Sequence, residues 1–93
     1  MTICDRAFSN CAVLSGIVLP STVKGIGKQA FYNCKKLRSI TINTLSLTSK
    51  NVGAQAFTGT YAKAVVKVPA KKFAAYKSLL RAKGMNVNAV YSK

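Results

Sequence analysis

The sequence predicts a β-rich α/β solenoid: a right-handed superhelix with short strands in each coil and a C-terminal capping helix. The first observation behind this prediction is a repeat, since the dipeptide Ala-Phe recurs at Ala7-Phe8, Ala30-Phe31 and Ala56-Phe57. Phe31 follows Phe8 by 23 residues and Phe57 follows Phe31 by 26, and a period of roughly 20–50 residues is typical of repeat architectures. The second observation is an amphipathic segment after the last repeat.

The positions around each Phe return the same type of side chain in successive repeats. In repeat order, the columns are Ile3, Ile26 and Val52; Cys4, Gly27 and Gly53; Cys11, Cys34 and Thr60; Leu14, Leu37 and Lys63; Ile17, Ile40 and Val66; and Leu19, Ile42 and Val68. Three residues depart from their columns, namely Cys4, Thr60 and Lys63. The columns indicate that about three coils, over residues 3–69, contribute equivalent apolar positions to one core.

Short strands are predicted at equivalent places in the three coils. The segment Leu37–Ile42 ends in an alternation of apolar and polar residues, which indicates a strand with one buried face. Its copies are Leu14–Leu19 and Lys63–Val68. Pro20 and Pro69 come directly after the strand residues, where a residue without a backbone donor ends a strand.

The rest of each coil is predicted to contain a second strand and a corner. Val23–Ile26 is a short extended run, and Gly27 after it suits a positive φ or a close approach of two backbones. The following Ala-Phe turn is predicted to be a helical or 3₁₀ corner. Residues 44–51 make the third repeat three residues longer than the others, which predicts a bulge on one edge of the array.

Residues 70–93 are predicted to cap the array. On a helix over 70–83, Phe73, Tyr76, Leu79 and Leu80 would share one face, while Lys71, Lys77 and Arg81 would face water. Gly84 supplies a helix stop, and Met85–Tyr91 is predicted as a last strand. A repeat array needs such a cap because its final coil otherwise exposes apolar side chains and an unpaired edge.

The repeat pattern resembles the BspA-like class of leucine-rich repeats of bacterial cell-surface proteins. Phe8, Cys11, Leu14, Ile17, Leu19, Pro20, Val23, Ile26 and Gly27 match it, Phe31 to Ile42 repeat most of it, and the resemblance covers about residues 3–69. The resemblance implies a bacterial cell-surface or secreted protein. It also implies a non-enzymatic adhesion module that binds host extracellular or cell-surface proteins.

The 93 residues are expected to form a single domain, with coils over 3–69 and a cap over 70–93. No cap precedes Ile3, so the N-terminal edge is expected to be uncovered. Two interpretations are open: the chain is a fragment of a longer array, or its edges pair in a homo-oligomer. Residues 1–13 do not resemble a signal peptide, and no apolar run is long enough to predict a membrane span.

Composition argues against catalysis and metal binding. The chain has no His and a single carboxylate side chain, Asp5, so acid–base chemistry has almost nothing to use. We therefore expect a non-enzyme without cofactors. The three cysteines include no C-x-x-C pair, so Cys11 and Cys34 are interpreted as small buried apolar residues. Cys4 is the candidate for an intermolecular disulfide.

The charge is strongly basic, with 15 Lys and Arg residues against one acid and a formal net charge of +14. Seven of these residues form a candidate basic patch: Lys35, Lys36, Arg38, Lys71, Lys72, Lys77 and Arg81. Such a surface attracts acidic polymers, including nucleic acid, glycans and cell-wall polymers. For each single lysine, a solvated surface position is the simpler interpretation.

The predicted strands also define a candidate binding face. Its outward residues are Gly16, Val18, Ser39, Thr41, Val65 and Lys67, while the alternate residues point into the core. The leading hypothesis is therefore a protein-binding or adhesion module that uses this face. The alternative is a structural spacer and cap that binds polyanions without specificity.

Overall fold

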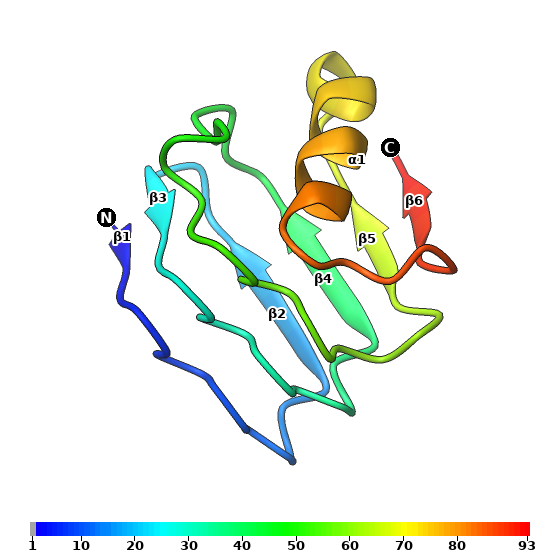
Figure 1. Cartoon of the computed structure of the whole chain (residues 1–93). Coiled ribbons are helices and arrows are strands. Elements are labelled where there is room, and N and C mark those ends of the chain that lie inside the picture. The colour runs from blue at the N-terminus through cyan, green and yellow to red at the C-terminus, as the bar shows by residue number, and fades with distance from the viewer. Residues whose placement is uncertain (1) are drawn as a thin grey trace.

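Equivalent positions of the repeats lie side by side in a four-stranded parallel sheet (Figure 1). The computed structural model describes residues 2–93. The strands, in spatial order, are β2 (Gly16–Leu19), β4 (Ser39–Ile42), β5 (Val65–Lys67) and β6 (Val90–Ser92). Ile17 pairs with Ile40, and Ile40 pairs with Val66, so the register of the sheet matches the sequence columns.

A second, smaller set of strands forms the opposite side of the coils. β1 (Thr2–Ile3) pairs in parallel with β3 (Gly25–Ile26), and Ile26 forms a further parallel bridge with Val52. All strands are shorter than the six-residue segments that the sequence suggested, because each coil has to turn twice within its 23 or 26 residues.

The predicted helical or 3₁₀ corner is wrong, because the Ala-Phe segment is a series of turns. Its backbone N–H groups donate alternately to a carbonyl within the same turn and to a carbonyl of the next coil. The Ala30 N–H donates to the Gly27 carbonyl at 3.3 Å within the turn, whereas the Phe31 N–H donates to Ala56 of the next coil at 2.8 Å. Gln29 and Asn33 have positive φ values of 54° and 59°. A helix cannot form here because left-handed residues interrupt it and half of its N–H groups bind the neighbouring coil.

The glycine column is explained by close approach of backbones. A Cβ atom on Gly27 would lie 2.3 Å from the Asp5 nitrogen, and one on Gly53 would lie 2.3 Å from the Lys28 nitrogen. Neither glycine has a φ in the left-handed region, so the second of the two predicted reasons applies. Cys4 stands in the same column on the first coil, where its side chain is exposed.

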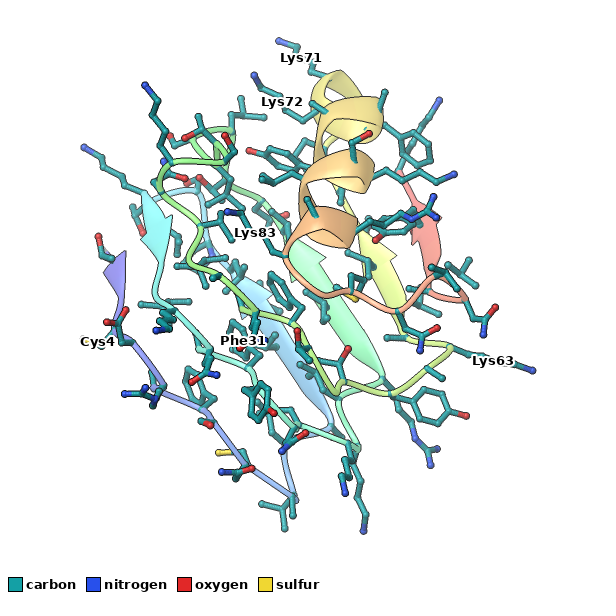
Figure 2. The ribbon with its side chains drawn as sticks, in the orientation of Figure 1. Cys4, Phe31, Lys63, Lys71, Lys72 and Lys83 are labelled. Atoms are coloured by element: carbon teal, nitrogen blue, oxygen red, sulfur yellow. The ribbon has the colours of Figure 1, made fainter. Side chains whose placement is uncertain are left out.

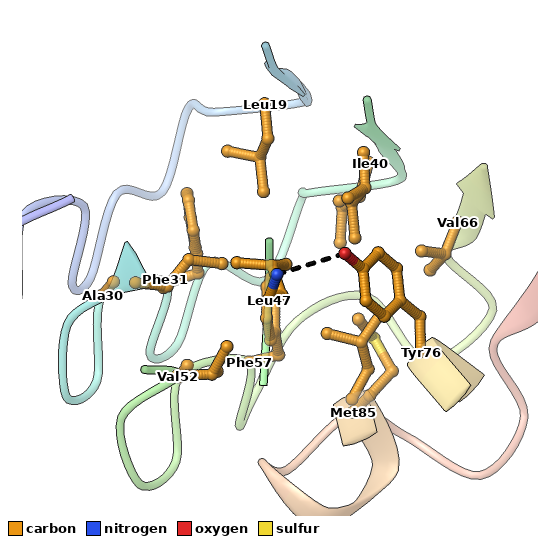
Figure 3. Close-up of a cluster of buried hydrophobic side chains, with 14 of the residues drawn as sticks. Leu19, Ala30, Phe31, Ile40, Leu47, Val52, Phe57, Val66, Tyr76 and Met85 are labelled. Atoms are coloured by element: carbon orange, nitrogen blue, oxygen red, sulfur yellow. Dashed lines mark hydrogen bonds between the residues drawn. The ribbon is translucent and has the colours of Figure 1, made fainter. Parts of the chain in front are cut away.

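The core runs through all coils and into the cap (Figure 3). Three phenylalanine rings form a stack: Phe8 and Phe31 have centroids 5.3 Å apart, as do Phe31 and Phe57. The inward strand residues are buried as predicted, namely Leu19, Ile40, Ile42, Val66 and Val68, while Ile17 is half-buried. Stacked identical side chains give each coil the same shape, which allows the coils to pack closely.

The extra residues of the third repeat form a loop that is fixed to the cap. The Leu47 N–H donates to the Tyr76 hydroxyl at 3.2 Å (Figure 3). The same hydroxyl donates to the Thr44 carbonyl at 2.8 Å. Leu47 is 5 % exposed and belongs to the core. The predicted bulge is therefore a loop in which a side chain of the helix satisfies two backbone groups, the Thr44 carbonyl and the Leu47 N–H.

The cap begins with the 3₁₀ helix η1 (Ala70–Lys72) and continues as α1 (Phe73–Ala82). Tyr76 and Leu80 are buried and Phe73 and Leu79 are half-buried, which confirms the predicted apolar face. Gly84 has a φ of 101° and ends the helix as expected.

The last strand differs from the prediction. Only Val90–Ser92 is extended, as β6, because Met85 packs into the core and residues 86–89 form a turn closed by the Ala89 N–H on the Asn86 carbonyl. β6 pairs with β5, and the Phe57 N–H donates to the Lys83 carbonyl at 3.1 Å. The cap thus pairs with the strand edge of the third coil and, through Lys83, accepts one N–H group of its corner.

Candidate binding face and basic surface

The six predicted face residues lie together on the outward side of the four-stranded sheet. The sheet register places Gly16, Ser39 and Val65 in one row and Val18, Thr41 and Lys67 in a second row. β6 extends the two rows by Val90 and Ser92. Sequence reasoning missed these two residues because the predicted strand there began five residues too early; the local alternation around Tyr91 is the signal that could have revealed them.

The face combines exposed methyl groups with small polar groups. Val18, Val65 and Val90 are 60 %, 47 % and 53 % exposed, and Val65 is the direct neighbour of Val90 across the sheet. Thr41 is half-buried and Lys67 is exposed. Lys67 is the one titratable side chain in the two rows. The face can therefore bind another surface mainly through apolar contacts and hydrogen bonds, and less through pairs of opposite charges.

An arginine and a tyrosine border the face at the amino ends of its strands. The Arg38 guanidinium lies 5.0 Å from the centroid of the Tyr61 ring, and both side chains are exposed. Arg38 directly precedes β4. Stacking on the ring restrains the guanidinium, so its charge has a defined position beside the face.

The seven residues of the candidate basic patch are not brought together. Lys35, Lys36 and Arg38 precede β4, whereas Lys71 and Lys72 follow β5, and the two strands are parallel. The two groups therefore lie at opposite ends of the sheet. Figure 2 shows Lys71 and Lys72 at one end of the molecule and Lys63, which precedes β5, at the other.

The remaining two basic residues lie along α1 near Tyr91. The Lys77 ammonium is 6.0 Å from the centroid of the Tyr91 ring. Burial raises the pKa of the Tyr91 hydroxyl, and the nearby charge of Arg81 lowers it in part. The hydroxyl is buried without a hydrogen-bond partner among the described residues. The only carboxylate side chain, on Asp5, accepts the Lys28 N–H at 2.8 Å and lies far from these groups along the chain.

The cysteines have three different environments. Cys34 is buried, Cys11 is half-buried and Cys4 is exposed, and all three are free thiols. Burial raises the pKa of the Cys34 thiol, whose sulfur lies 2.9 Å from the Phe8 carbonyl oxygen. Cys34 is therefore a small buried residue of the core, as predicted. A neutral buried thiol is also a poor nucleophile.

The structure also contains a hollow that the sequence did not predict. It lies between α1 and the loop of the third coil and has a volume of about 350 Å³. Its lining residues are Leu47, Thr48, Ser49, Ala75, Tyr76, Ser78, Leu79 and Ala82. These residues are about 30 positions apart in the sequence, so no local pattern could have indicated the hollow.

The repeat geometry has a counterpart in the comparison with protein families. The family model described as the BspA type leucine rich repeat region matches residues 1–81. The chain belongs to this family. The BspA-type match confirms the resemblance drawn from the columns and extends it from the coils into the capping helix.

The BspA-type family supports a repeat module for protein interaction, and the family is generally non-enzymatic and typically associated with bacterial surfaces. Within residues 2–93, no helix is both long and apolar enough to cross a membrane. Neither the comparison with curated proteins nor that with solved structures gives a match.

Proposed function

We propose that this chain is a protein-binding, adhesive module of a bacterial surface or secreted protein, and that it binds host extracellular proteins through the outward face of its sheet. The observation that carries the proposal is the pair of side-chain rows on β2, β4, β5 and β6, with exposed Val18, Val65 and Val90. Valine suits a strand position whether or not it is buried, and three valines exposed on one face also favour contact with a partner.

The composition of the face suits moderate affinity. Valine loses little side-chain entropy on binding because its χ1 is already restricted by branching. The hydroxyl groups of Ser39 and Thr41 add hydrogen bonds, and Lys67 favours an acidic partner surface. A flat face of this kind gains useful avidity when several modules act together.

The coils are inferred to form a right-handed solenoid. Neighbouring strands of the sheet are parallel, and parallel strands joined by a crossover are right-handed in about 98 % of cases. The outward face then continues smoothly from coil to coil, which is the geometry that lets repeat proteins present an extended binding surface.

The proposal is tested by binding of the purified chain to immobilised fibronectin at physiological and at high salt. The triple variant Val18→Ser, Thr41→Ala, Lys67→Gln should lose most of the binding. A matched control carries Val87→Ser and Lys50→Gln, two exposed positions outside the face, and should bind as the parent does. Equal binding by the triple variant would instead favour a structural spacer.

The charge supports a second candidate function, which is non-specific binding of acidic polymers. With a net charge of +14 and basic groups at both ends of the sheet, the chain can contact a polyanion in several orientations. Binding to heparin and DNA would then fall steeply with salt through counterion release. Binding to fibronectin, heparin and DNA that disappears together at high salt would leave this second function alone.

A further inference from the structure

The hollow between α1 and the loop of the third coil has a helix wall of mostly small side chains. On the helix, Ala75, Ser78, Leu79 and Ala82 line it, at the spacing that places residues on one face of a helix. From Ala75 to Ala82 the wall extends over about 10 Å of helix. A larger side chain at Ala75 or Ala82 would project into this space, so the small size of these residues keeps the hollow open.

Hydrogen bonds hold the other parts of the hollow in place. Leu47 and Tyr76 line it and are buried, and the Leu47 N–H donates to the Tyr76 hydroxyl at 3.2 Å. In the loop wall, the Thr48 N–H donates to the Asn51 side-chain oxygen at 2.7 Å, and the Asn51 side-chain nitrogen donates to the Ser46 carbonyl at 2.7 Å. These bonds attach the loop to the helix, so the hollow is formed before a ligand binds, as is usual for small-molecule sites.

Positive charges lie around the hollow. Lys72 directly precedes α1 and Lys83 directly follows it, and Figure 2 shows both side chains on the side of the helix that faces the loop of the third coil. In the loop, Lys50 directly follows the lining residue Ser49. The single carboxylate side chain of the protein, on Asp5, belongs to the first coil. A ligand that fits this site therefore joins an apolar part to a negative charge, because the charge stays at the lysines while the apolar part leaves water.

We propose that the hollow binds the anion of a medium-chain fatty acid, with the acyl chain between α1 and the loop and the carboxylate at Lys72 or Lys83. Its volume of about 350 Å³ lies at the lower end of the range for small-molecule sites, roughly 300–1,000 Å³. Apart from Tyr76, the apolar side chains that line it are aliphatic, which favours an acyl chain over a flat aromatic ring.

This site is independent of the proposed adhesive function. The loop that lines the hollow follows β4, and α1 follows β5, so the hollow lies at the carboxyl ends of these strands. The adhesive face is instead formed by the outward side chains within the strands. Binding at the two places can therefore be measured and removed separately.

The test is binding of decanoate, below its micelle concentration, to the whole isotope-labelled chain, followed through the backbone amide signals in NMR spectra. Decyltrimethylammonium has the same chain with the opposite charge, and acetate has the carboxylate without the chain. Ala82→Leu fills the hollow. The matched control is Ala74→Leu, the same change at an exposed position of α1 outside the lining.

A second pair of variants tests the charges. Lys72→Gln combined with Lys83→Gln removes the lysines at the two ends of α1. Lys77→Gln combined with Arg81→Gln removes the same number of charges from exposed positions that lie near Tyr91 and outside the lining. The comparison separates local contacts from general attraction by the net charge of +14.

We expect decanoate to shift the amide signals of residues 47–49 and 75–82 and to bind more tightly than acetate by about twofold to fourfold for each buried methylene. Ala82→Leu should weaken decanoate binding by about tenfold or more, while Ala74→Leu should leave it unchanged. The variant without Lys72 and Lys83 should bind about threefold to tenfold more weakly than the parent. The variant without Lys77 and Arg81 should differ from the parent by less than about twofold.

Equal binding by the two leucine variants would overturn the proposal, and so would equal binding of decanoate and decyltrimethylammonium. Amide shifts spread over the whole surface would indicate non-specific attraction and would overturn it as well. If an acidic leucine-containing peptide shifts the same amides and decanoate does not, the hollow belongs to a protein partner instead. Should the spectrum of Ala82→Leu show an unfolded chain, Ala75→Leu makes the same test at the other end of the helix wall. The face variant Val18→Ser, Thr41→Ala, Lys67→Gln should bind decanoate as the parent does.

Discussion

Two tyrosine hydroxyl groups in the cap provide a matched test of the packing, because the same substitution should have opposite effects. The Tyr76 hydroxyl bonds to Thr44 and Leu47 in the loop of the third coil. The Tyr91 hydroxyl is buried but has no partner in the described residues. Tyr76→Phe should therefore destabilise the protein, while Tyr91→Phe should stabilise it or leave its stability unchanged.

The expected magnitudes follow from these contacts. Tyr76→Phe removes two hydrogen bonds and leaves a buried carbonyl and a buried N–H unpaired, each of which costs about 1–3 kcal/mol when water cannot replace the bond. Water can enter the adjacent hollow, which Tyr76 and Leu47 line, so we expect a total loss of about 2 kcal/mol. Tyr91→Phe removes an unsatisfied hydroxyl and should add up to about 1 kcal/mol.

Urea unfolding followed by circular dichroism measures both effects. A domain of this size has a free energy of unfolding of about 5–14 kcal/mol, so a loss of about 2 kcal/mol shifts the midpoint clearly while the m-value stays the same. The thermal midpoint should fall by roughly 10 °C. A neutral Tyr76→Phe variant together with a destabilised Tyr91→Phe variant would refute the assignment of these two environments.

Three further predictions concern the coils and the pH dependence. Gly53→Ala should cost about 2–3 kcal/mol in urea unfolding because the new methyl group would meet the Lys28 backbone, while Cys4→Ala, in the same column, should change stability by less than about 0.5 kcal/mol. Phe31→Ala should cost about 3–5 kcal/mol, clearly more than Phe8→Ala, because Phe31 is fully buried and Phe8 only half-buried; equal losses would contradict this difference in burial. Because burial raises the pKa of the Tyr91 hydroxyl, its contribution to folding is complete below about pH 10 and is lost as the pH rises through the higher folded-state pKa; a pH series should show less alkaline destabilisation in Tyr91→Phe than in the parent.

The sequence by itself determined the features that depend on periodicity. The Ala-Phe dipeptides and their columns predicted the coils, the inward residues such as Ile40 and Val66, and the outward residues such as Val18, because a repeat must place equivalent residues at equivalent positions. The amphipathic pattern of residues 70–83 likewise predicted the buried face of α1. The glycine column could be assigned to two causes, and only the distance between coils showed that close approach was the one.

Only the tertiary structure decided the features that depend on neighbours distant in the chain. The corner looked helical in sequence, but its N–H groups bind the next coil, and such bonds leave no local pattern. The strand register added Val90 and Ser92 to the binding face and separated the basic residues to opposite ends of the sheet. The missing partner of the buried Tyr91 hydroxyl is also invisible in sequence, because only the folded arrangement of the described residues shows which polar groups lack a partner.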